Sequence, residues 1–264
     1  MTQWALLLEY DGTGFVGWQR QENGLSLQQV LEEAAARLAG SPVASVVAGR
    51  TDAGVHASGQ VAMIALPDRF AAAQVRDALN FHMKPHPIVV LRAERAPPGW
   101  NPRFSATGRI YTYAILNRRA RPALERRVWH VPVPLDAEAM GVAARGLLGR
   151  HDFTSFRAAA CQANSPWRTL DRLDVTRTGD VITVRAEARS FLHHQVRNMV
   201  GTLKLVGEGR WAPERVAAAL AARDRSAAGP TAPPEGLILL GVRYAEDPFT
   251  PAAADRTPAA ACPR

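Results

Sequence analysis

Two series of apolar segments run along the chain. In the first, apolar residues alternate or run together where strands are expected, and recur every three to four positions where helices are expected. The pattern predicts the order β-α-β-β-α-β. The predicted strands cover 4–12, 44–49, 59–66 and 88–95, and the predicted helices cover 25–40 and 71–83.

The helix over 25–40 has the clearest signals at its ends. Ser26 stands at the N-cap position, and Gln29 follows three residues later, as in a capping box. The apolar residues from Leu27 to Leu38 form one stripe, and Gly40 is the residue type that most often ends a helix. This element is therefore predicted from its boundaries as well as from its period.

A second series begins after the proline-rich stretch "APPGWNPR" and has a similar order. The loop "HDFTSFRAAACQANSPW" interrupts it, and a hairpin turn is predicted at Thr178-Gly179-Asp180. Asp136 opens one helix, and Pro213 lies in the first turn of another. The predicted strands cover 109–116, 168–179, 180–189 and 236–244, and the predicted helices cover 136–149, 191–209 and 212–223.

The fold class predicted from this repetition is α+β. We expect two similar halves, 1–105 and 106–245, with mixed or antiparallel sheets side by side, helices on one face and an active-site cleft between them. The Pro/Ala-rich residues 246–264 are predicted to form a disordered tail.

Composition narrows the function. The net charge is +8, and all but two of the 32 basic residues are arginine. The preference for Arg over Lys is mostly what GC-rich coding produces. The excess of positive over negative side chains, however, favours a nucleic-acid partner. Two cysteines are too few for a disulfide framework or a zinc site. No apolar run reaches membrane length and no leader peptide is recognisable, so a cytoplasmic protein is expected.

The stretch "VVAGRTDAGVHASGQVA" contains more polar chemistry than a hairpin turn requires. Arg50 and Asp52 stand among glycines between two predicted strands. An arginine near a carboxylate favours its ionised form, which suits a nucleophile or an electrostatic stabiliser. The alternative is an ordinary aspartate turn with a surface ion pair. No phosphate-binding loop and no second aspartate loop of this kind is present.

The stretch "RIYTY" places Arg109, Tyr111 and Tyr113 on one face of a strand. A face with basic and aromatic groups can stack on unpaired bases and hold phosphates. A tyrosine packed at the edge of a sheet explains the same pattern equally well.

The stretch "FLHHQVRNMVG" places Arg197 at the border of the apolar stripe of a helix. A cation there needs a partner, and Asp52 is one candidate. The neighbouring His193 and His194 suggest a metal, but no third ligand stands at helical spacing, so we expect no metal. Contact with phosphate, or a place at the helix start, suits these histidines better.

Two further groups of residues are candidates for contact with RNA. Gln19 and Arg20 follow Trp18 just after the first strand. The basic stretch "NRRARPALERR" is usually a solvated loop, but in a chain of this charge it is also a plausible contact for an RNA backbone. Its candidate residues are Arg118, Arg119 and Arg121.

Five blocks together resemble the tRNA pseudouridine synthase A family over about residues 4–245. They are "YDGTGFVGWQRQ", "AGRTDAGVHASGQVA", "RFSATGRIYTY", "HDFTSF" and "FLHHQVRNMVG", in the family's order. The resemblance implies the pseudouridine synthase fold and a homodimer without a cofactor. It also implies isomerisation of uridine to pseudouridine at positions 38, 39 and 40 in the anticodon stem-loop of tRNA.

The resemblance also implies residue roles. Asp52 would be the nucleophile, Arg50 would help to open the target base pair, Tyr111 would stack on the uracil, and Arg197 would pair with Asp52. Two departures from the family pattern, at 101–103 and at Gln195, leave this set intact. Two other readings stay open: an RNA-binding module of the same fold without catalysis, and a hydrolase that uses Asp52 on a small substrate.

Overall fold

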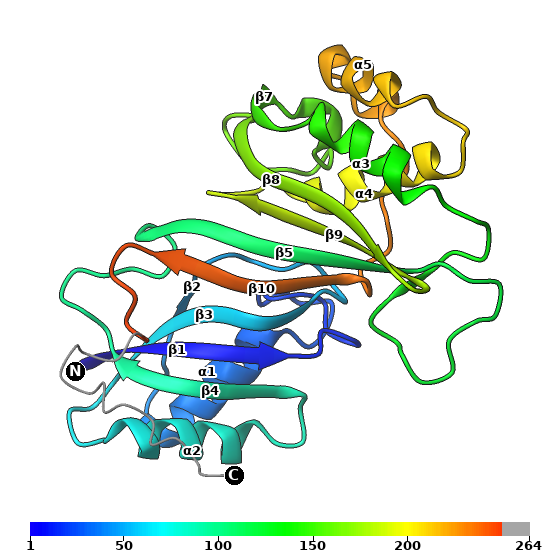
Figure 1. The fold of residues 1–264 in the computed structure, drawn as a ribbon. Helices are drawn as coiled ribbons and strands as arrows, with labels where there is room; N and C mark the ends of the chain where they lie inside the picture. Colours follow the sequence, from blue (N-terminus) through cyan, green and yellow to red (C-terminus); the bar gives the residue numbers. More distant parts are fainter. Residues whose placement is uncertain (250–264) are drawn as a thin grey trace, which may run out of the picture.

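The computed structural model describes residues 1–249 and contains one ten-stranded, mostly antiparallel sheet (Figure 1). The strands along the main path follow the order β4-β1-β3-β10-β5-β9-β8-β7, while β2 pairs with β3 and β6 with β5. The strands are β1 (Thr2–Tyr10), β2 (Ser45–Val47), β3 (His56–Leu66), β4 (Ile88–Arg95), β5 (Ala106–Leu116), β6 (Trp129–His130), β7 (Gly149–Asp152), β8 (Trp167–Thr178), β9 (Val181–Ala188) and β10 (Leu237–Tyr244).

Five α-helices and two short 3₁₀ turns complete the fold. The turns cover Thr154–Phe156 and Arg225–Ala227, and the helices are α1 (Leu27–Ala39), α2 (Ala72–Met83), α3 (Ala137–Arg145), α4 (Gln195–Gly207) and α5 (Glu214–Ala222). Helix α1 has the predicted ends, because the Ser26 hydroxyl accepts from the Gln29 N–H and Gly40 adopts φ 78°. The α+β class is confirmed.

The two halves repeat one strand arrangement. In the first, β1 lies between β4 and β3, and β2 pairs with β3; in the second, β5 lies between β10 and β9, and β8 pairs with β9. Two sheets side by side were predicted, but the halves form one continuous sheet. The junction is a short parallel pairing, Ile238 opposite His56 and Leu239 opposite Ala57. The domain boundary at 105/106 therefore stays a prediction.

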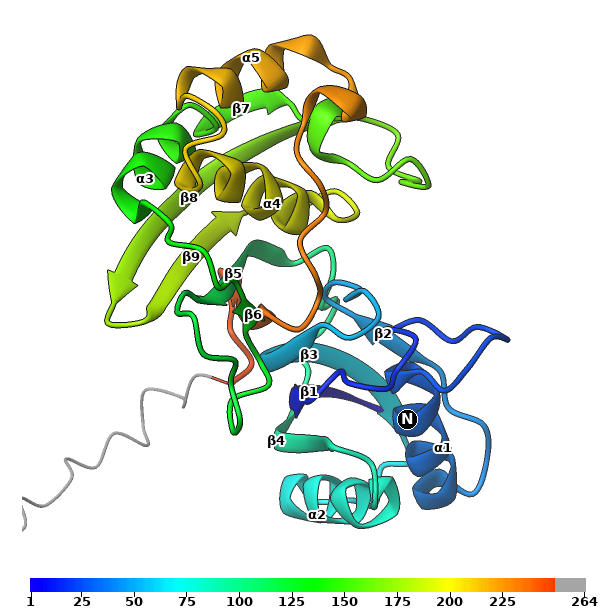
Figure 2. The ribbon, with the colours of Figure 1, turned by 90° about the vertical axis from the view of Figure 1, so that its right-hand side faces the viewer.

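One face of the sheet carries the main core and the helices. Figure 2 shows α1 and α2 with the first half and α3, α4 and α5 with the second. All five helices bury apolar residues in the same cluster. Residues of that cluster are opposite one another on six neighbouring strands. From the first half to the second they are Tyr10, Ala57, Leu239, Tyr111, Ala186 and Leu173.

Three predictions need correction. The predicted helix over 136–149 ends at Arg145, because residues 149–152 form the edge strand β7. The predicted helix over 191–209 begins at Gln195. Ordered chain also continues past 245: Phe249 is buried in a small cluster with Trp100, while the rest of the predicted disordered tail, from residue 250, lies outside the described residues. Within residues 1–249, no helix has the length and apolar character needed to cross a membrane.

Candidate active site

Residues 48–55, here called the aspartate loop, connect β2 to β3 and are anchored on both sides. The Tyr10 hydroxyl lies 2.8 Å from the Thr51 hydroxyl, and the Gln60 amide donates to the Gly49 carbonyl at 2.8 Å. The Trp18 N–H donates to the Thr51 carbonyl at 3.0 Å. Burial raises the pKa of Tyr10 to about 12, against the effect of its hydrogen bonds with Thr51 and Gln60. Tyr10 therefore acts as a neutral anchor.

Two glycines let other segments approach this loop closely. Gly17 adopts φ +108°, and a Cβ there would lie 2.9 Å from the Thr51 carbonyl oxygen. Gly54 adopts φ +76°, and a Cβ there would lie 2.9 Å from Pro234 Cγ. Because both conformations favour glycine and both contacts leave little room for a side chain, these residues fix the path of the loop against both halves.

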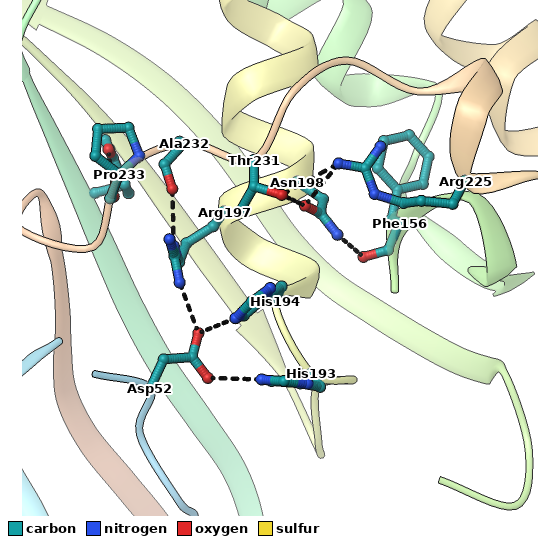
Figure 3. Close-up of polar contacts among 11 residues, drawn as sticks. Asp52, Phe156, His193, His194, Arg197, Asn198, Arg225, Thr231, Ala232 and Pro233 are labelled. Carbon is teal, nitrogen blue, oxygen red and sulfur yellow. Dashed lines mark hydrogen bonds and ion pairs between the residues drawn. The ribbon is translucent and has the colours of Figure 1, made fainter. Parts of the chain in front are cut away.

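The Asp52 side chain meets three cationic or polar groups from the second half (Figure 3). Arg197 Nη1 donates to Asp52 Oδ2 at 3.1 Å. His193 Nε2 lies 3.4 Å from Oδ1, and His194 Nε2 lies 3.4 Å from Oδ2. Arg197 and Asp52 keep 13% and 20% of their side chains exposed. The carboxylate is thus held by charge and is still reachable from solvent.

His194 occupies an unusual backbone position just before α4. It adopts φ 62°, one of two non-glycine residues with positive φ among residues 1–249. Such a conformation costs free energy and is found most often at functional sites. Burial lowers the pKa of His194, against the opposing effect of the Asp52 charge. The lowered pKa favours the neutral form of His194 at neutral pH, with its Nε2 3.4 Å from Asp52 Oδ2.

A second layer of contacts fixes Arg197. Its Nε donates to the Ala232 carbonyl at 2.8 Å, and the Ala232 N–H donates to the Arg197 carbonyl at 3.1 Å. The adjacent Asn198 is fully buried: it accepts from Thr231 at 2.7 Å and from Arg225 at 3.2 Å (Figure 3). Sequence analysis missed this layer, because Asn198 lies on the side of α4 away from the stripe of Val196, Met199 and Val200, and distant segments bury it.

Tyr111 is 9% exposed and belongs to the main core. Its ring meets Phe191 edge to face, with centroids 5.3 Å apart. Burial raises the pKa of Tyr111, and the negative charge of Asp52 acts in the same direction. Tyr111 is therefore a neutral phenol.

The structure changes the interpretation of Arg109. The residue is 8% exposed, and its guanidinium donates to the backbone carbonyls of Ala48, Arg103 and Arg189 at 2.6, 2.9 and 2.6 Å. Burial lowers its pKa. A guanidinium used in this way ties three segments together, so we assign Arg109 a structural function instead of contact with RNA.

The other candidates lie outside the Asp52 cluster. Arg50 is exposed, and within residues 1–249 no ion pair joins it to Asp52. The guanidinium that pairs with the carboxylate is that of Arg197. Gln19 is exposed, and Arg20 lies 3.9 Å from both Glu32 and Glu33. The exposed loop after β5 carries Arg118, Arg119 and Arg121.

The metal argument also needs correction. A third ligand does exist, because Asp52 brings its carboxylate within 4.8 Å of the ligand atoms of His193 and His194. It was missed because it comes from a loop far away in sequence instead of from the same helix. Histidine and carboxylate donors suit zinc, but the Arg197 guanidinium already lies 3.1 Å from one carboxylate oxygen. Its positive charge disfavours a second cation.

The fold and this site define an α+β protein in which a carboxylate from one half is held by a guanidinium from the other. The sequence matches a family model described as tRNA pseudouridine synthase over residues 7–105 and 143–245. The chain belongs to the tRNA pseudouridine synthase family, whose members are isomerases, and the resemblance given by its motifs is confirmed.

Curated relatives cover nearly the whole chain. A protein named tRNA pseudouridine synthase A from Acidiphilium cryptum is 72% identical over 94% of this chain and 99% of its own length. A protein of the same name from Paramagnetospirillum magneticum is 61% identical over 92% of this chain and 96% of its own length. The similarity therefore includes both halves and both sides of the Asp52 cluster.

Proposed function

We propose that this chain isomerises uridine to pseudouridine at positions 38, 39 and 40 in the anticodon stem-loop of tRNA, with Asp52 as the nucleophile. The observation that carries the proposal is the ion pair between Asp52 and Arg197, 3.1 Å long and formed across the two halves of a chain in this family. The curated relatives carry the name tRNA pseudouridine synthase A, and the net charge of +8 suits an RNA substrate.

The target base is stacked in a helical stem, so the enzyme has to flip it out before chemistry begins. Arg50 is exposed and stands two residues before Asp52, so it can fill the space that the base leaves or hold a phosphate. Tyr111 supplies an aromatic surface for the flipped uracil. Phe191 packs against the Tyr111 ring edge to face, which fixes its orientation.

The Asp52 carboxylate then reacts with the flipped nucleotide, and the bond between N1 of uracil and C1′ of the ribose breaks. The uracil rotates, C5 bonds to C1′ and Asp52 is released. The C5 proton is lost to solvent, and N1, which no longer carries the ribose, takes up a proton from solvent. Arg197 pairs with the carboxylate and orients it, and His193 and His194 face its two oxygens. Reactant and product have the same composition, so the reaction consumes no cosubstrate, and we propose that it needs no cofactor.

The proposal also includes contacts and an assembly that depend on the family resemblance. Homodimer formation and a cytoplasmic location belong to it, as does contact of one exposed glutamine and four exposed arginines with the RNA backbone. These residues are Gln19, Arg20, Arg118, Arg119 and Arg121, with His193 and His194 close to the reacting nucleotide.

The test uses an unmodified tRNA transcript with uridine at positions 38–40, the purified protein and no additives. We expect pseudouridine confined to the anticodon arm and release of tritium from C5-labelled uridine. Asp52→Asn should lower turnover by about 10⁴-fold or more, the scale on which removal of a catalytic nucleophile acts, and leave tRNA binding largely unchanged.

Three results would contradict the proposal. Product outside the anticodon arm would refute the site. Tritium release by Asp52→Asn at the rate of the unchanged protein would refute the nucleophile. Tight, salt-dependent tRNA binding without any isomerisation would identify an RNA-binding module of the same fold.

A further inference from the structure

A basic pocket with an aromatic wall lies outside the Asp52 cluster. It has a volume of about 200 Å³ and lies beside the start of β8 and the segment that follows β9. Its lining residues are Arg150, Trp167, Arg168, Thr169, Arg189 and Ser190. None of these residues takes part in the proposed reaction.

The pocket is positively charged and its charges are not neutralised. Within residues 1–249, no ion pair involves Arg150, Arg168 or Arg189, and no acidic side chain lines the pocket. Arg168 donates from Nη1 to the carbonyls of Ser165 and Trp167, while its buried Nε has no hydrogen-bond partner. Unpaired guanidinium groups gathered in one place are suited to bind phosphate.

The carboxylate of Asp152, which lies beside the pocket in the strand register, is paired elsewhere. Asp152 is opposite Trp167 in the register of β7 and β8, but one of its oxygens accepts from Thr154 and the other lies 3.6 Å from Arg223. It is therefore already paired and leaves the charge of the pocket in place.

Trp167 gives the pocket an apolar surface that water reaches. The residue is 42% exposed, although tryptophan is usually well buried in a folded protein. The Arg150 guanidinium lies 4.9 Å from the centre of its ring. An exposed aromatic ring next to arginines is the arrangement that stacks on an unpaired base and holds its phosphate.

The pocket also lies close to the reacting residues. Arg189 precedes His193 by four residues, so even an extended chain spans at most about 14 Å between them. The Arg109 guanidinium binds both the Arg189 carbonyl and the Ala48 carbonyl, and so joins the pocket wall to the aspartate loop. A strand with one nucleotide at Asp52 therefore has a nearby nucleotide within reach of the pocket.

We propose that this pocket binds an unpaired nucleotide of the RNA substrate, with its phosphate on the arginines and its base on Trp167. The inference rests on the proposed function, because it concerns the same RNA. It adds a second point of attachment that selects substrates with an accessible nucleotide a short distance from the reacting uridine.

The test compares this pocket with another pair of the same chemistry. At α5, the Arg215 guanidinium lies 4.3 Å from the Trp211 ring, outside the proposed pocket. Trp167→Ala and Arg150→Ala should each raise KM and Kd for tRNA about tenfold, since one stacked base or one phosphate contact contributes on that scale. Trp211→Ala and Arg215→Ala should leave both values unchanged.

Two further measurements separate binding from folding and from catalysis. Arg150→Ala should reduce the slope of log Kd against log salt by about 1, as expected for the loss of one phosphate contact. Trp167→Phe keeps an aromatic ring and should retain most of the affinity. Trp167→Leu fills part of the same space without an aromatic ring, should lose affinity as the alanine variant does, and replaces it if that variant melts early.

If the unchanged protein forms pseudouridine, unchanged KM, Kd and salt slope in Arg150→Ala would overturn the phosphate contact. Unchanged KM and Kd in a folded Trp167→Ala or Trp167→Leu would overturn the stacking contact. Equal losses in the α5 pair would overturn both. If the unchanged protein forms no pseudouridine, the proposed function fails instead, and the Kd measurements still decide whether this pocket binds RNA.

Discussion

The two halves of the molecule share a strand order, but the connection from β2 to β3 differs from the corresponding connection from β8 to β9. In the second half, β8 has 12 residues and pairs with β9 down to Thr178 opposite Val181, so that a tight turn at Gly179 suffices. In the first half, β2 has 3 residues and pairs with β3 only from Ile64 to Ala62. The aspartate loop then covers residues 48–55 before β3 begins.

The difference follows from how the halves join. β10 of the second half pairs with the start of β3, at His56 and Ala57, on the edge that β2 would otherwise continue to occupy. The chain between β2 and β3 must therefore leave the sheet, and Asp52 on it reaches Arg197 of α4. The aspartate loop is thus a consequence of joining two similar halves into one sheet.

The corresponding helices differ as well. α2 begins after Ala71, whereas α4 begins after His194 and carries Arg197 and the buried Asn198. The first half therefore supplies the carboxylate, and the second half supplies the groups that hold it. A functional site that needs both halves should fail when the connection between them is broken, even where each half still folds.

Among the variants that test this comparison, Arg197→Ala should have the largest effect, because it removes the ion pair between the halves. We expect kcat to fall about 10²-fold, since loss of a charged hydrogen bond in a partly buried pair costs about 2–3 kcal/mol. Arg197→Lys keeps the charge but cannot bind Asp52 and the Ala232 carbonyl together, so its rate should lie in between. Single-turnover pseudouridine formation measures this.

Arg145→Ala is the control for Arg197→Ala, because Arg145 is exposed at the end of α3 and within residues 1–249 has no ion pair. A wild-type kcat in Arg197→Ala would show that Asp52 acts without its partner from the second half.

The sequence allowed most elements to be predicted from local pattern. It also offered Asp52 as one candidate partner of Arg197, a pair that the family resemblance implied. The stripe and caps of α1 were readable from Ser26 to Gly40. Arg197 was placed at the border of its helix stripe with Asp52 as a candidate partner, and the ion pair is present in the structure. Period and charge balance were sufficient for these predictions.

The parts that were missed depend on contacts between distant segments. The continuous sheet depends on two residue pairs between β3 and β10, too short a contact to leave a pattern. Arg109 looked like an RNA contact because its alternation with Tyr111 was correct, but the alternation does not tell whether that end of the strand is buried. The joint placement of His193 and His194 beside Asp52 had no local signal either.

A smaller effect is expected from adding one methyl group to each connecting loop. Gly54 and Gly179 both have positive φ, +76° and +57°, but only a Cβ at Gly54 meets another segment, Pro234 at 2.9 Å. Gly179→Ala should cost about 1–2 kcal/mol for its backbone conformation and leave activity unchanged. Gly54→Ala should cost more and also lower kcat, because the loop has to move away from Pro234.

Urea unfolding and single-turnover rates measure this pair of variants. Equal losses of stability and activity in the two variants would mean that the aspartate loop is no more constrained by the other half than an ordinary hairpin turn is.

The smallest effect is expected from the pH dependence of stability in His194→Asn. Asparagine tolerates the φ of 62° that His194 adopts, but it does not titrate. The fold lowers the pKa of His194, so the folded state binds fewer protons than the unfolded state as pH falls below about 7. The unchanged protein should therefore lose stability relative to His194→Asn between pH 7 and the lowered pKa, and the difference should level off below it. The urea midpoints of both proteins at several pH values measure this. If the two curves of midpoint against pH are parallel, the fold does not change the pKa of His194.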